Sequence, residues 1–371
     1  MKIAVIAHIR HPVAEPFMGG MEAHCRMLCD GLRTAGHTVD LFASGRSDDP
    51  QLITICDKPY EDVLPWARHR GTRELAEYQE DAFASAWAYI LEGGYDVVHN
   101  NSLFPDIMLW AARDDMPCVT SQHVPPFGAM QSAVSSTAHA PTLRSTVTSQ
   151  DQIGLWDMQS RSNMSVVHNG VRCDRWLPHD EPDEYFIWVG RITPNKGTAH
   201  AARAARLAGV SLRIFGPVED AQYFVSEVEP HLTDGVEYHG HCTADQLRPL
   251  VAKAKGALVT PLWDEPFGLV AVEALSCGTP VCAFASGALA EVVGECGFVT
   301  KAGDIAALAE SMARIGEIDR SACRQRALTK FSVQTMIEGY EASYRAAIDG
   351  VLSQAAAAFA SRNSRTAALL A

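Results

Sequence analysis

Two series of short apolar runs, each alternating with longer amphipathic stretches, limit the folds open to this chain. The first series begins with residues 3–7, and the second restarts at residues 186–189, after the polar, proline-containing segment 174–184. Strands that alternate with helices form parallel sheets with helices on both faces. The sequence therefore predicts an α/β protein with two domains, each a doubly wound parallel sheet. Ligands of such sheets bind beyond the carboxyl ends of the strands.

The boundary between the two domains is expected near Leu177. The chain then divides into domains at 1–176 and 177–331, a helix at 332–350, and an Ala-rich tail at 351–371 that is either a helix of low specificity or disordered. Further strands are expected at 39–43, 97–100, 118–121 and 146–149 in the first domain, and at 212–215, 236–238, 257–260, 281–284 and 298–300 in the second.

Composition excludes several classes of protein. The 371 residues carry a formal net charge of −13, whereas general nucleic-acid binding requires an excess of Lys and Arg. The ten cysteines have no Cys-x-x-Cys spacing, so we expect core packing and no metal site. The apolar run at 1–7 is too short for a signal peptide, and no later run reaches the roughly 18 apolar residues of a membrane span. The expected compartment is the cytoplasm.

The segment 261–280 is the most informative about function. Glu265 and Glu273 lie on either side of Gly268, where a turn leads into an apolar helix. Free amides and the positive end of that helix then face the same space as the two carboxylates, an arrangement that suits a sugar joined to a diphosphate. A first-turn acid is common in helices, but a carboxylate such as Glu273 among apolar helix residues is costly to bury without a partner.

Two cations follow the first strand of the second domain. Arg191 and Lys196 lie between Gly190 and Gly197, just past the strand end. Fixed cations stabilise a diphosphate leaving group more strongly as its charge grows in the transition state. Taken alone, the pair could equally be two solvated residues of a loop.

Together, these two segments resemble the signature of the retaining glycosyltransferases of family 4. The resemblance extends from Met1 to about Ile348 and implies the GT-B fold, in which two Rossmann-like domains face a cleft and the last helix crosses back to the first domain. It implies that Arg191 and Lys196 bind the diphosphate, Glu265 a hydroxyl of the transferred sugar and Glu273 the ribose. The amides that would reach sugar and phosphate are those of Phe267, Gly268, Leu269 and Val270.

The first domain carries the family's Gly-Gly-x-Glu pattern as Gly19, Gly20 and Glu22, between its first strand and first helix. The resemblance places the glycines near the diphosphate and the glutamate on the acceptor side. His123 ends a strand and is expected to touch the donor sugar; the alternative is a capping or loop histidine. The acceptor side is completed by His99, Asn100 and Asn101, although family members often carry a second histidine in place of Asn101.

Two further strand ends are expected to flank the base of the nucleotide. They carry the pairs Phe215-Gly216 and His239-Gly240. The basic, aromatic segment 66–73 could meet an anionic acceptor or a membrane surface, while a solvated helix face explains it more simply.

The sequence thus predicts a retaining hexosyltransferase that uses a nucleotide diphosphate sugar, most often a UDP-sugar in this family, and a hydroxyl acceptor. The chain contains no Asp-x-Asp, the acidic pair that holds a divalent ion on the diphosphate, so neither metal nor cofactor is expected. The alternatives are a nucleotide-sugar epimerase of related fold and a protein that binds a nucleotide sugar without turnover. A dehydrogenase is the weakest alternative, because the three-glycine dinucleotide pattern is missing.

Overall fold

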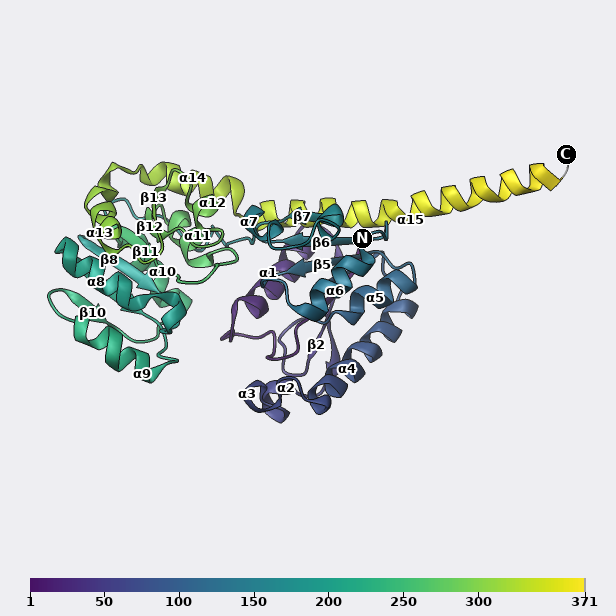
Figure 1. Cartoon of the computed structure of the whole chain (residues 1–371), viewed down its shortest axis with the longest axis horizontal. Coiled ribbons are helices and arrows are strands. Elements are labelled where there is room, and N and C mark those ends of the chain that lie inside the picture. Colours follow the sequence, from purple (N-terminus) through teal and green to yellow (C-terminus); the bar gives the residue numbers. More distant parts are fainter. Residues whose placement is uncertain (370–371) are drawn as a thin grey trace. The chain divides into compact units, whose positions relative to one another are not determined.

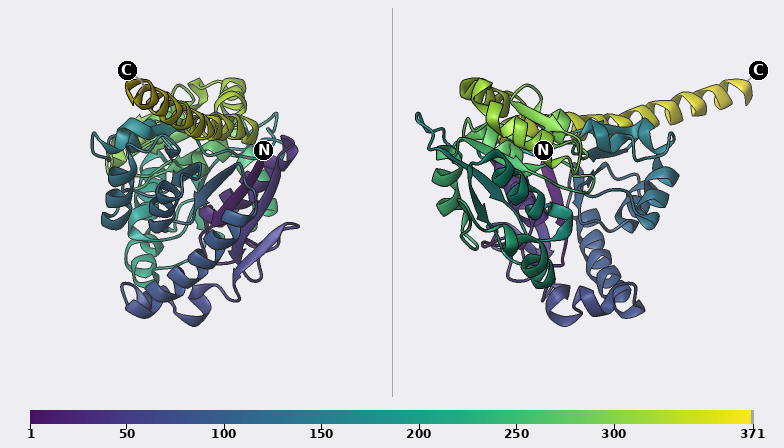
Figure 2. Two further views of the ribbon diagram at one scale, coloured as in Figure 1. Left: turned by 90° about the vertical axis from the view of Figure 1, so that its right-hand side faces the viewer. Right: turned by 60° about the vertical axis from the view of Figure 1, so that its left-hand side comes forward.

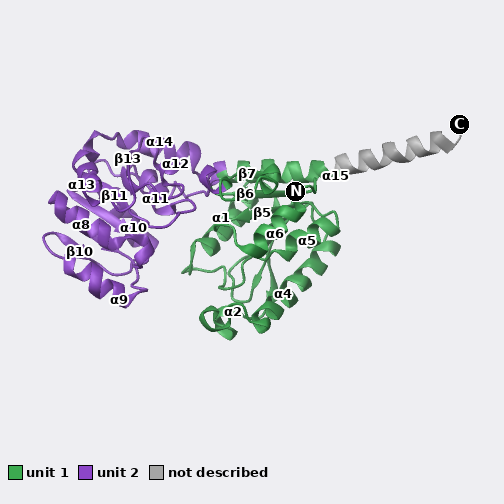
Figure 3. Cartoon of the chain, viewed as in Figure 1, with its two compact units in different colours: residues 1–148, 153–167, 336–371 green, residues 149–152, 168–335 purple. Residues whose placement is uncertain are grey.

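The computed structural model describes the backbone of residues 1–369 and the side chains of residues 1–351. These residues form two compact units (Figure 3). Unit 1 contains residues 1–148 and 153–167 and takes up the chain again from Met336, while unit 2 contains residues 149–152 and 168–335. Apart from Val351, the expected Ala-rich tail (351–371) lies outside the residues whose side chains are described.

Unit 1 is built on a parallel sheet with the strand order β3-β2-β1-β4-β5-β6-β7 (Figure 1). Its strands are β1 (Lys2–Ala7), β2 (Thr38–Ser44), β3 (Leu52–Cys56), β4 (Val97–Asn101), β5 (Cys118–Gln122), β6 (Leu143–Val147) and β7 (Met164–Val166). Its helices are α1 (Gly20–Thr34), α2 (Tyr60–Val63), α3 (Trp66–His69), α4 (Arg73–Glu92), α5 (Asp106–Arg113) and α6 (Gly128–Thr137), with α7 (Gln150–Ile153) at the unit boundary and the turn η1 (Ser160–Asn163).

Unit 2 contains a second parallel sheet, with the order β10-β9-β8-β11-β12-β13. Its strands are β8 (Tyr185–Val189), β9 (Ser211–Phe215), β10 (Val236–Tyr238), β11 (Gly256–Val259), β12 (Val281–Phe284) and β13 (Gly297–Thr300). Its helices are α8 (Thr198–Ala208), α9 (Ala221–Tyr223), α10 (Ala244–Lys253), α11 (Leu269–Ser276), α12 (Leu289–Val293), α13 (Ile305–Arg314) and α14 (Arg320–Lys330), with short turns η2 (Pro194–Lys196), η3 (Phe224–Val228), η4 (Glu229–His231) and η5 (Ile315–Glu317).

Helices cover both faces of each sheet, as expected when every strand pairs with a parallel neighbour (Figures 1 and 2). In unit 2 the two faces form separate apolar cores: Phe267 and Leu275 pack in one, and Phe284 and Ile214 in the other. The fold class predicted from the sequence is confirmed. The expected strand at 146–149 lies slightly earlier, as β6, and the edge strands β3 and β7 were missed.

The last helix, α15 (Val333–Leu369), is continuous (yellow in Figure 2) and leaves unit 2 for unit 1 at Met336. Tyr340 and Tyr344 are fully buried in unit 1, where their hydroxyls bond to Ser121 and His99. The return of the last helix to the first unit, expected from the resemblance, is therefore present. Apolar side chains of this helix and its two tyrosines supply the burial that fixes it there.

The contacts change unit at His168, earlier than the boundary expected near Leu177. Val171, Cys173 and Trp176 are buried in a core of unit 2, and Val171 N–H donates to the carbonyl of Phe331. Within the polar segment 174–184, only the part after Trp176 fits a linker. The apolar residues up to Trp176 already pack in unit 2.

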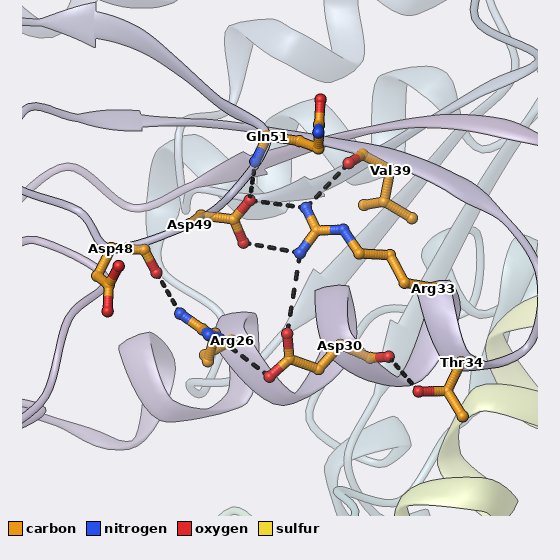
Figure 4. Close-up of polar contacts among 8 residues, drawn as sticks. All are labelled: Arg26, Asp30, Arg33, Thr34, Val39, Asp48, Asp49 and Gln51. Carbon is orange, nitrogen blue, oxygen red and sulfur yellow. Dashed lines mark hydrogen bonds and ion pairs between the residues drawn. The ribbon is translucent and has the colours of Figure 1, made fainter.

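A buried ion pair anchors the C-terminal end of α1 (Figure 4). Arg33 binds both carboxylate oxygens of Asp49 at 2.9 and 2.7 Å, and the Asp49 side chain is fully buried. Arg26 and Asp30 extend the network along the same helix. Because a bidentate Arg–carboxylate pair fixes orientation, it holds the helix whose other end begins at Gly20.

Candidate active site

Three glycines of unit 2 bring the ends of neighbouring strands into close contact. Gly190, Gly216 and Gly240 follow β8, β9 and β10, and the amide of Gly216 donates to the carbonyl of Gly240 at 2.9 Å. A Cβ on Gly216 would lie 1.8 Å from the carbonyl oxygen of Gly190, and the φ of Gly216 is +144°. Only glycine fits at this position, so the absence of a side chain allows the ends of these strands to pack closely where a ligand of such a sheet would lie.

The loops that carry Lys196 and Glu265 are tied together by their main chains. Leu262 N–H donates to the carbonyl of Asn195 at 2.8 Å, and the Thr260 hydroxyl donates to the carbonyl of Gly197 at 3.0 Å. A Cβ on Gly197 would lie 2.0 Å from the carbonyl oxygen of Thr260. The small residue therefore permits the contact that brings the two predicted site residues together.

The structure pairs these two residues directly. Lys196 Nζ lies 2.7 Å from Glu265 Oε2, with both side chains partly exposed. The same oxygen accepts a hydrogen bond of 3.1 Å from the indole N–H of Trp263, and Lys196 Nζ lies 5.2 Å from the centre of a Trp263 ring. Trp263 was not singled out from the sequence, although it stands only two residues before Glu265.

Arg191 lies apart from this group. Its guanidinium pairs with Glu219 at 3.0 Å, and the side chains are 57% and 43% exposed. An exposed ion pair of this kind is weak, so the side chain is free to exchange partners.

Glu273 is isolated on α11, one turn beyond the start of the helix. Gly268 precedes the helix with φ of +94°, and the first helical amides, those of Leu269 and Val270, have no intrahelical acceptor. The carboxylate of Glu273 lines a small cavity and makes no hydrogen bond or ion pair with any residue in the described part of the chain. Burial raises the pKa of Glu273 to about 8, and the nearby Arg248 partly offsets this effect. The other residues that line this cavity are Trp176, Ile187, Val189, Val251, Ala257, Val270 and Ala274.

The two residues expected near the base are brought together. The rings of Phe215 and His239 stack with 5.1 Å between their centres and an interplanar angle of 18°. His239 also lies 3.1 Å from Glu237, while the Phe267 side chain, 2% exposed, belongs to the core. Only the main chain of Phe267 is therefore left for a ligand, as the sequence analysis assumed.

In unit 1, the glycine pair begins a helix. Gly19 is the N-terminal cap of α1, and a Cβ on it would lie 3.0 Å from Glu22 Oε2. The carboxylate thus folds back over the glycine and is 5% exposed. Gly20 and Glu22 stand in the first turn, where free amides and the helix dipole favour negative charge.

His123 is held by two neighbours. Its Nε2 lies 2.6 Å from Asn101 Oδ1, and its ring lies 4.3 Å from that of His24, which the sequence analysis missed. Burial lowers the pKa of His123 to about 4, so the ring is neutral near pH 7. Because Asn101 Oδ1 accepts, Nε2 carries the proton and Nδ1 is left as an acceptor.

His99 and Asn100 do not fit the acceptor-side role predicted for them. Both side chains are fully buried, and both ring nitrogens of His99 are bonded, to Tyr344 at 2.6 Å and Ser121 at 2.9 Å. Asn100 Oδ1 accepts from the amide and the hydroxyl of Ser102. A strand end places alternate side chains on opposite faces, and the face of His99 is covered by α15. These two residues therefore stabilise the fold.

The basic, aromatic segment 66–73 is partly paired within unit 1. The guanidinium groups of Arg10 and Arg70 lie 5.7 and 5.6 Å from the Trp66 ring, and Arg10 also binds Glu61. The charge that the segment offers to a partner is accordingly reduced.

The described residues contain no group of three or more His, Cys, Asp or Glu side chains arranged to hold a metal ion. Among the helices described, none combines the length and the apolarity that crossing a bilayer requires.

Known families match both halves of the chain. Residues 18–175 match the model for glycosyltransferase family 4, and residues 174–329 match that for glycosyl transferases group 1. The glycogen synthase of Mycobacterium tuberculosis is 27% identical, with 94% of this chain and 96% of that protein aligned. The D-inositol 3-phosphate glycosyltransferase of Mycobacteroides abscessus is also 27% identical, with 79% of this chain and 76% of the relative aligned.

The fold has close counterparts among solved structures. HepE from Anabaena, crystallised in complex with UDP, superposes with a TM-score of 0.69 at 19% identity and covers 92% of this chain and 99% of its own. The two parallel sheets and this structural neighbour define a GT-B fold. The chain belongs to the GT-B glycosyltransferases, with a family 4 module in its first half and a group 1 module in its second.

Proposed function

We propose that this glycosyltransferase moves a hexose from a UDP-sugar to a hydroxyl acceptor, with retention at the anomeric carbon and without a metal ion. The observation that carries the proposal is the arrangement in unit 2: Lys196 and Glu265 in contact, the free amides of α11 nearby in sequence, and Glu273 without a partner among the described residues. A diphosphate suits the cation and the amides, and ribose hydroxyls suit the lone carboxylate.

In the proposed reaction, the bond between the anomeric carbon and the phosphate oxygen breaks, and its electron pair stays on that oxygen. The acceptor hydroxyl attacks the same face of the sugar, and its proton passes to the departing phosphate oxygen. No protein nucleophile is needed. Lys196 leaves Glu265 to stabilise the growing negative charge, and Arg191 joins it by leaving the weak pair with Glu219.

Glu265 would bind a hydroxyl of the transferred sugar through Oε1, because Lys196 and Trp263 both bond to Oε2. Phe215 and His239 would flank the base through the main chain at Gly216 and Gly240. The donor nucleotide is proposed as UDP because HepE, of the same fold, was crystallised with UDP.

Unit 1 is proposed as the acceptor-binding unit, with a further contact to the donor. Gly19 and Gly20 would approach the diphosphate, and Glu22 would accept a hydrogen bond from the acceptor hydroxyl. His123 Nδ1, left unprotonated by the bond to Asn101, would accept a hydrogen bond from the sugar. Because Asn101 is hydrogen-bonded to His123, we propose that it acts by orienting the His123 ring.

The acceptor's identity is not assigned, and the names of the relatives span glycogen synthesis and inositol 3-phosphate glycosylation. A cytoplasmic location and a peripheral membrane contact through segment 66–73 remain predictions. Arg68, Arg70 and Arg73 are the exposed cations of that segment; Arg70 lies over the Trp66 ring, and Arg73 pairs with Glu77 at 2.7 Å.

A thermal-shift and turnover experiment separates this function from its rivals. Purified protein is heated with UDP, GDP, ADP and their sugars in the presence of a chelator, because a ligand that binds the folded state raises the melting temperature. We expect stabilisation by UDP and slow release of UDP from the UDP-sugar. Conversion of the sugar without release of UDP would indicate an epimerase. Binding with neither transfer nor hydrolysis over a panel of hydroxyl acceptors would indicate a non-catalytic protein, and activity restored only by magnesium would refute the metal-free mechanism.

A further inference from the structure

We propose that Trp263 is the residue that keeps Glu265 in position while Lys196 moves to the diphosphate. This inference rests on the proposed function and adds to it a positioning residue in the donor site. One carboxylate oxygen, Oε2 of Glu265, accepts hydrogen bonds from both Lys196 and Trp263, at 2.7 and 3.1 Å.

The other oxygen of this carboxylate, Oε1, has no bond to any side chain or main chain in the part of the protein that the structure describes. Within the described residues, both side-chain bonds of Glu265 are made at Oε2, which leaves Oε1 free to accept a hydroxyl. The two donors on Oε2 therefore fix the direction in which Oε1 points. A sugar hydroxyl would bind at the free oxygen without displacing either donor.

The two donors respond differently to a diphosphate. Lys196 is a cation on a flexible chain, so a diphosphate with more negative charge than one carboxylate competes for it. The indole N–H of Trp263 is uncharged and fixed in a rigid ring, so it has no comparable tendency to leave. When Lys196 changes partner, the bond from Trp263 is the one that still holds Glu265.

The loop that carries Trp263 is anchored on both sides. Ser286 donates its hydroxyl to the carbonyl of Pro261 at 2.8 Å, and the amide of Ala288 donates to the carbonyl of Glu265 at 2.9 Å. The Trp263 side chain is only partly buried and belongs to neither apolar core of unit 2. Core packing therefore does not account for an indole at this place, whereas the bond to Glu265 does.

The experiment compares two replacements of Trp263. Trp263→Phe keeps an aromatic ring beside Lys196 but removes the N–H, and Trp263→His keeps an N–H in a five-membered ring. Trp87→Phe is the control, because Trp87 makes a similar bond of 2.8 Å to Asp114 in unit 1. UDP affinity, kcat, KM for the UDP-sugar and melting temperature are measured for each.

We expect Trp263→Phe to lower kcat by about 10- to 100-fold, the range of one hydrogen bond to a charged group, with UDP affinity within about twofold of the parent. Trp263→His should recover part of the loss, and Trp87→Phe should retain kcat. Combining Trp263→Phe with Glu265→Gln should cost little more than Glu265→Gln alone, because both changes remove the same interaction.

Three results would overturn the inference: parental kcat in Trp263→Phe, equal losses of UDP affinity and kcat, or full additivity with Glu265→Gln. If Trp263→Phe melts several degrees lower than Trp87→Phe, the comparison of Trp263→His with Trp263→Phe decides, because only the former restores the donor. Absence of UDP binding and turnover in the parent protein would instead refute the proposed function itself.

Discussion

The strand ends of the two units carry polar groups of opposite character. In unit 2 the Lys196–Glu265 pair is charged and reaches solvent, while Glu273, on the helix that follows, has no partner among the residues that the structure describes. In unit 1 the strand-end histidines are neutral, because burial lowers the pKa of His123 to about 4 and of His99 to about 3. Two parallel sheets with similar strand order can therefore carry different polar groups. Those of unit 2 are charged and can respond to a leaving diphosphate, whereas the histidines of unit 1 are neutral and give directional hydrogen bonds.

Among these site groups, the contrast implies that the charge change near neutral pH is that of Glu273 in unit 2. The imidazoles of His24, His99 and His123 all have lowered pKa values because burial disfavours their charged forms. Glu273 has a raised pKa for the same reason, and its value of about 8 lies in the physiological range. Variants in each unit can test whether this division holds.

The largest effect is expected for Lys196→Ala. Loss of the cation should lower kcat by about 100- to 1,000-fold, because its interaction strengthens as the diphosphate leaves. The affinity for UDP-sugar should fall much less. Steady-state kinetics gives kcat, and calorimetric titration of the UDP-sugar without acceptor gives the affinity.

Lys255→Ala is the matched control, since Lys255 pairs with Glu184 in the same unit at an exposed position. It should behave as the parent. Equal turnover in Lys196→Ala and Lys255→Ala would show that Lys196 does not act on the diphosphate. The proposed difference between the charged groups of unit 2 and the neutral groups of unit 1 would then have no role in the reaction.

A smaller effect, on binding, is expected for Glu273→Gln. Two ribose hydroxyls that donate to a carboxylate favour its ionised form, so losing the charge should weaken UDP binding by about 10- to 100-fold. Calorimetry at a fixed pH of about 8 measures this loss.

The same variant tests the pKa. In the free protein the pKa of Glu273 is raised to about 8, so UDP binding at lower pH must first remove a proton. The affinity of the parent should therefore rise with pH and level off above about pH 8, with proton release on binding. Ionisation of UDP itself affects both proteins equally, and Glu273→Gln should lack the additional rise. Parallel profiles would contradict the ribose assignment.

More of the strands and site contacts could be predicted from the sequence in unit 2 than in unit 1. All six strands of unit 2 were placed from the sequence, including its partly buried edge strands β10 and β13, whereas the edge strands β3 and β7 of unit 1 were missed. Lys196 and Glu265 were both singled out from the sequence, and the structure brings them together because each follows a strand of one parallel sheet, where strand ends converge. Their direct pairing, and the bond from Trp263, depend on loop geometry that spacing does not encode.

In unit 1 the strand-end residues could be predicted from the sequence, but the directions of their side chains could not. His99 was assigned to the acceptor because it ends a strand, yet its partner Tyr344 lies 245 residues later on α15. His24 was missed because it lies on a helix with no motif to mark it, and only the fold brings its ring against His123. Long-range contacts of this kind have no local sequence signal.

A moderate effect in unit 1 is expected for Asn101→Ala. The variant removes the acceptor that holds the His123 Nε2–H at 2.6 Å, so the ring can adopt either tautomer and Nδ1 is no longer reliably an acceptor. We expect kcat/KM to fall by about 10-fold, the value of one hydrogen bond, with little change in UDP affinity.

Asn163→Ala is a suitable control, because the Asn163 amide bonds only to main-chain carbonyls of unit 1. A loss of kcat/KM in Asn163→Ala as large as that in Asn101→Ala would show that general loosening of unit 1, and not the orientation of His123, is responsible.

The smallest effect on activity is expected for Tyr344→Phe, which tests whether His99 serves the fold alone. The change leaves the buried Nδ1 of His99 without its 2.6 Å partner, so the free energy of unfolding should fall by about 1–3 kcal/mol. Chemical denaturation measures this loss against Tyr89→Phe, which removes an exposed hydroxyl. If His99 only stabilises the fold, kcat and KM for every acceptor stay at parental values. A rise in acceptor KM alone, without loss of stability, would show that His99 acts in the acceptor site. Both units would then use buried polar groups to bind a ligand, and the difference between them would be smaller than their polar groups indicate.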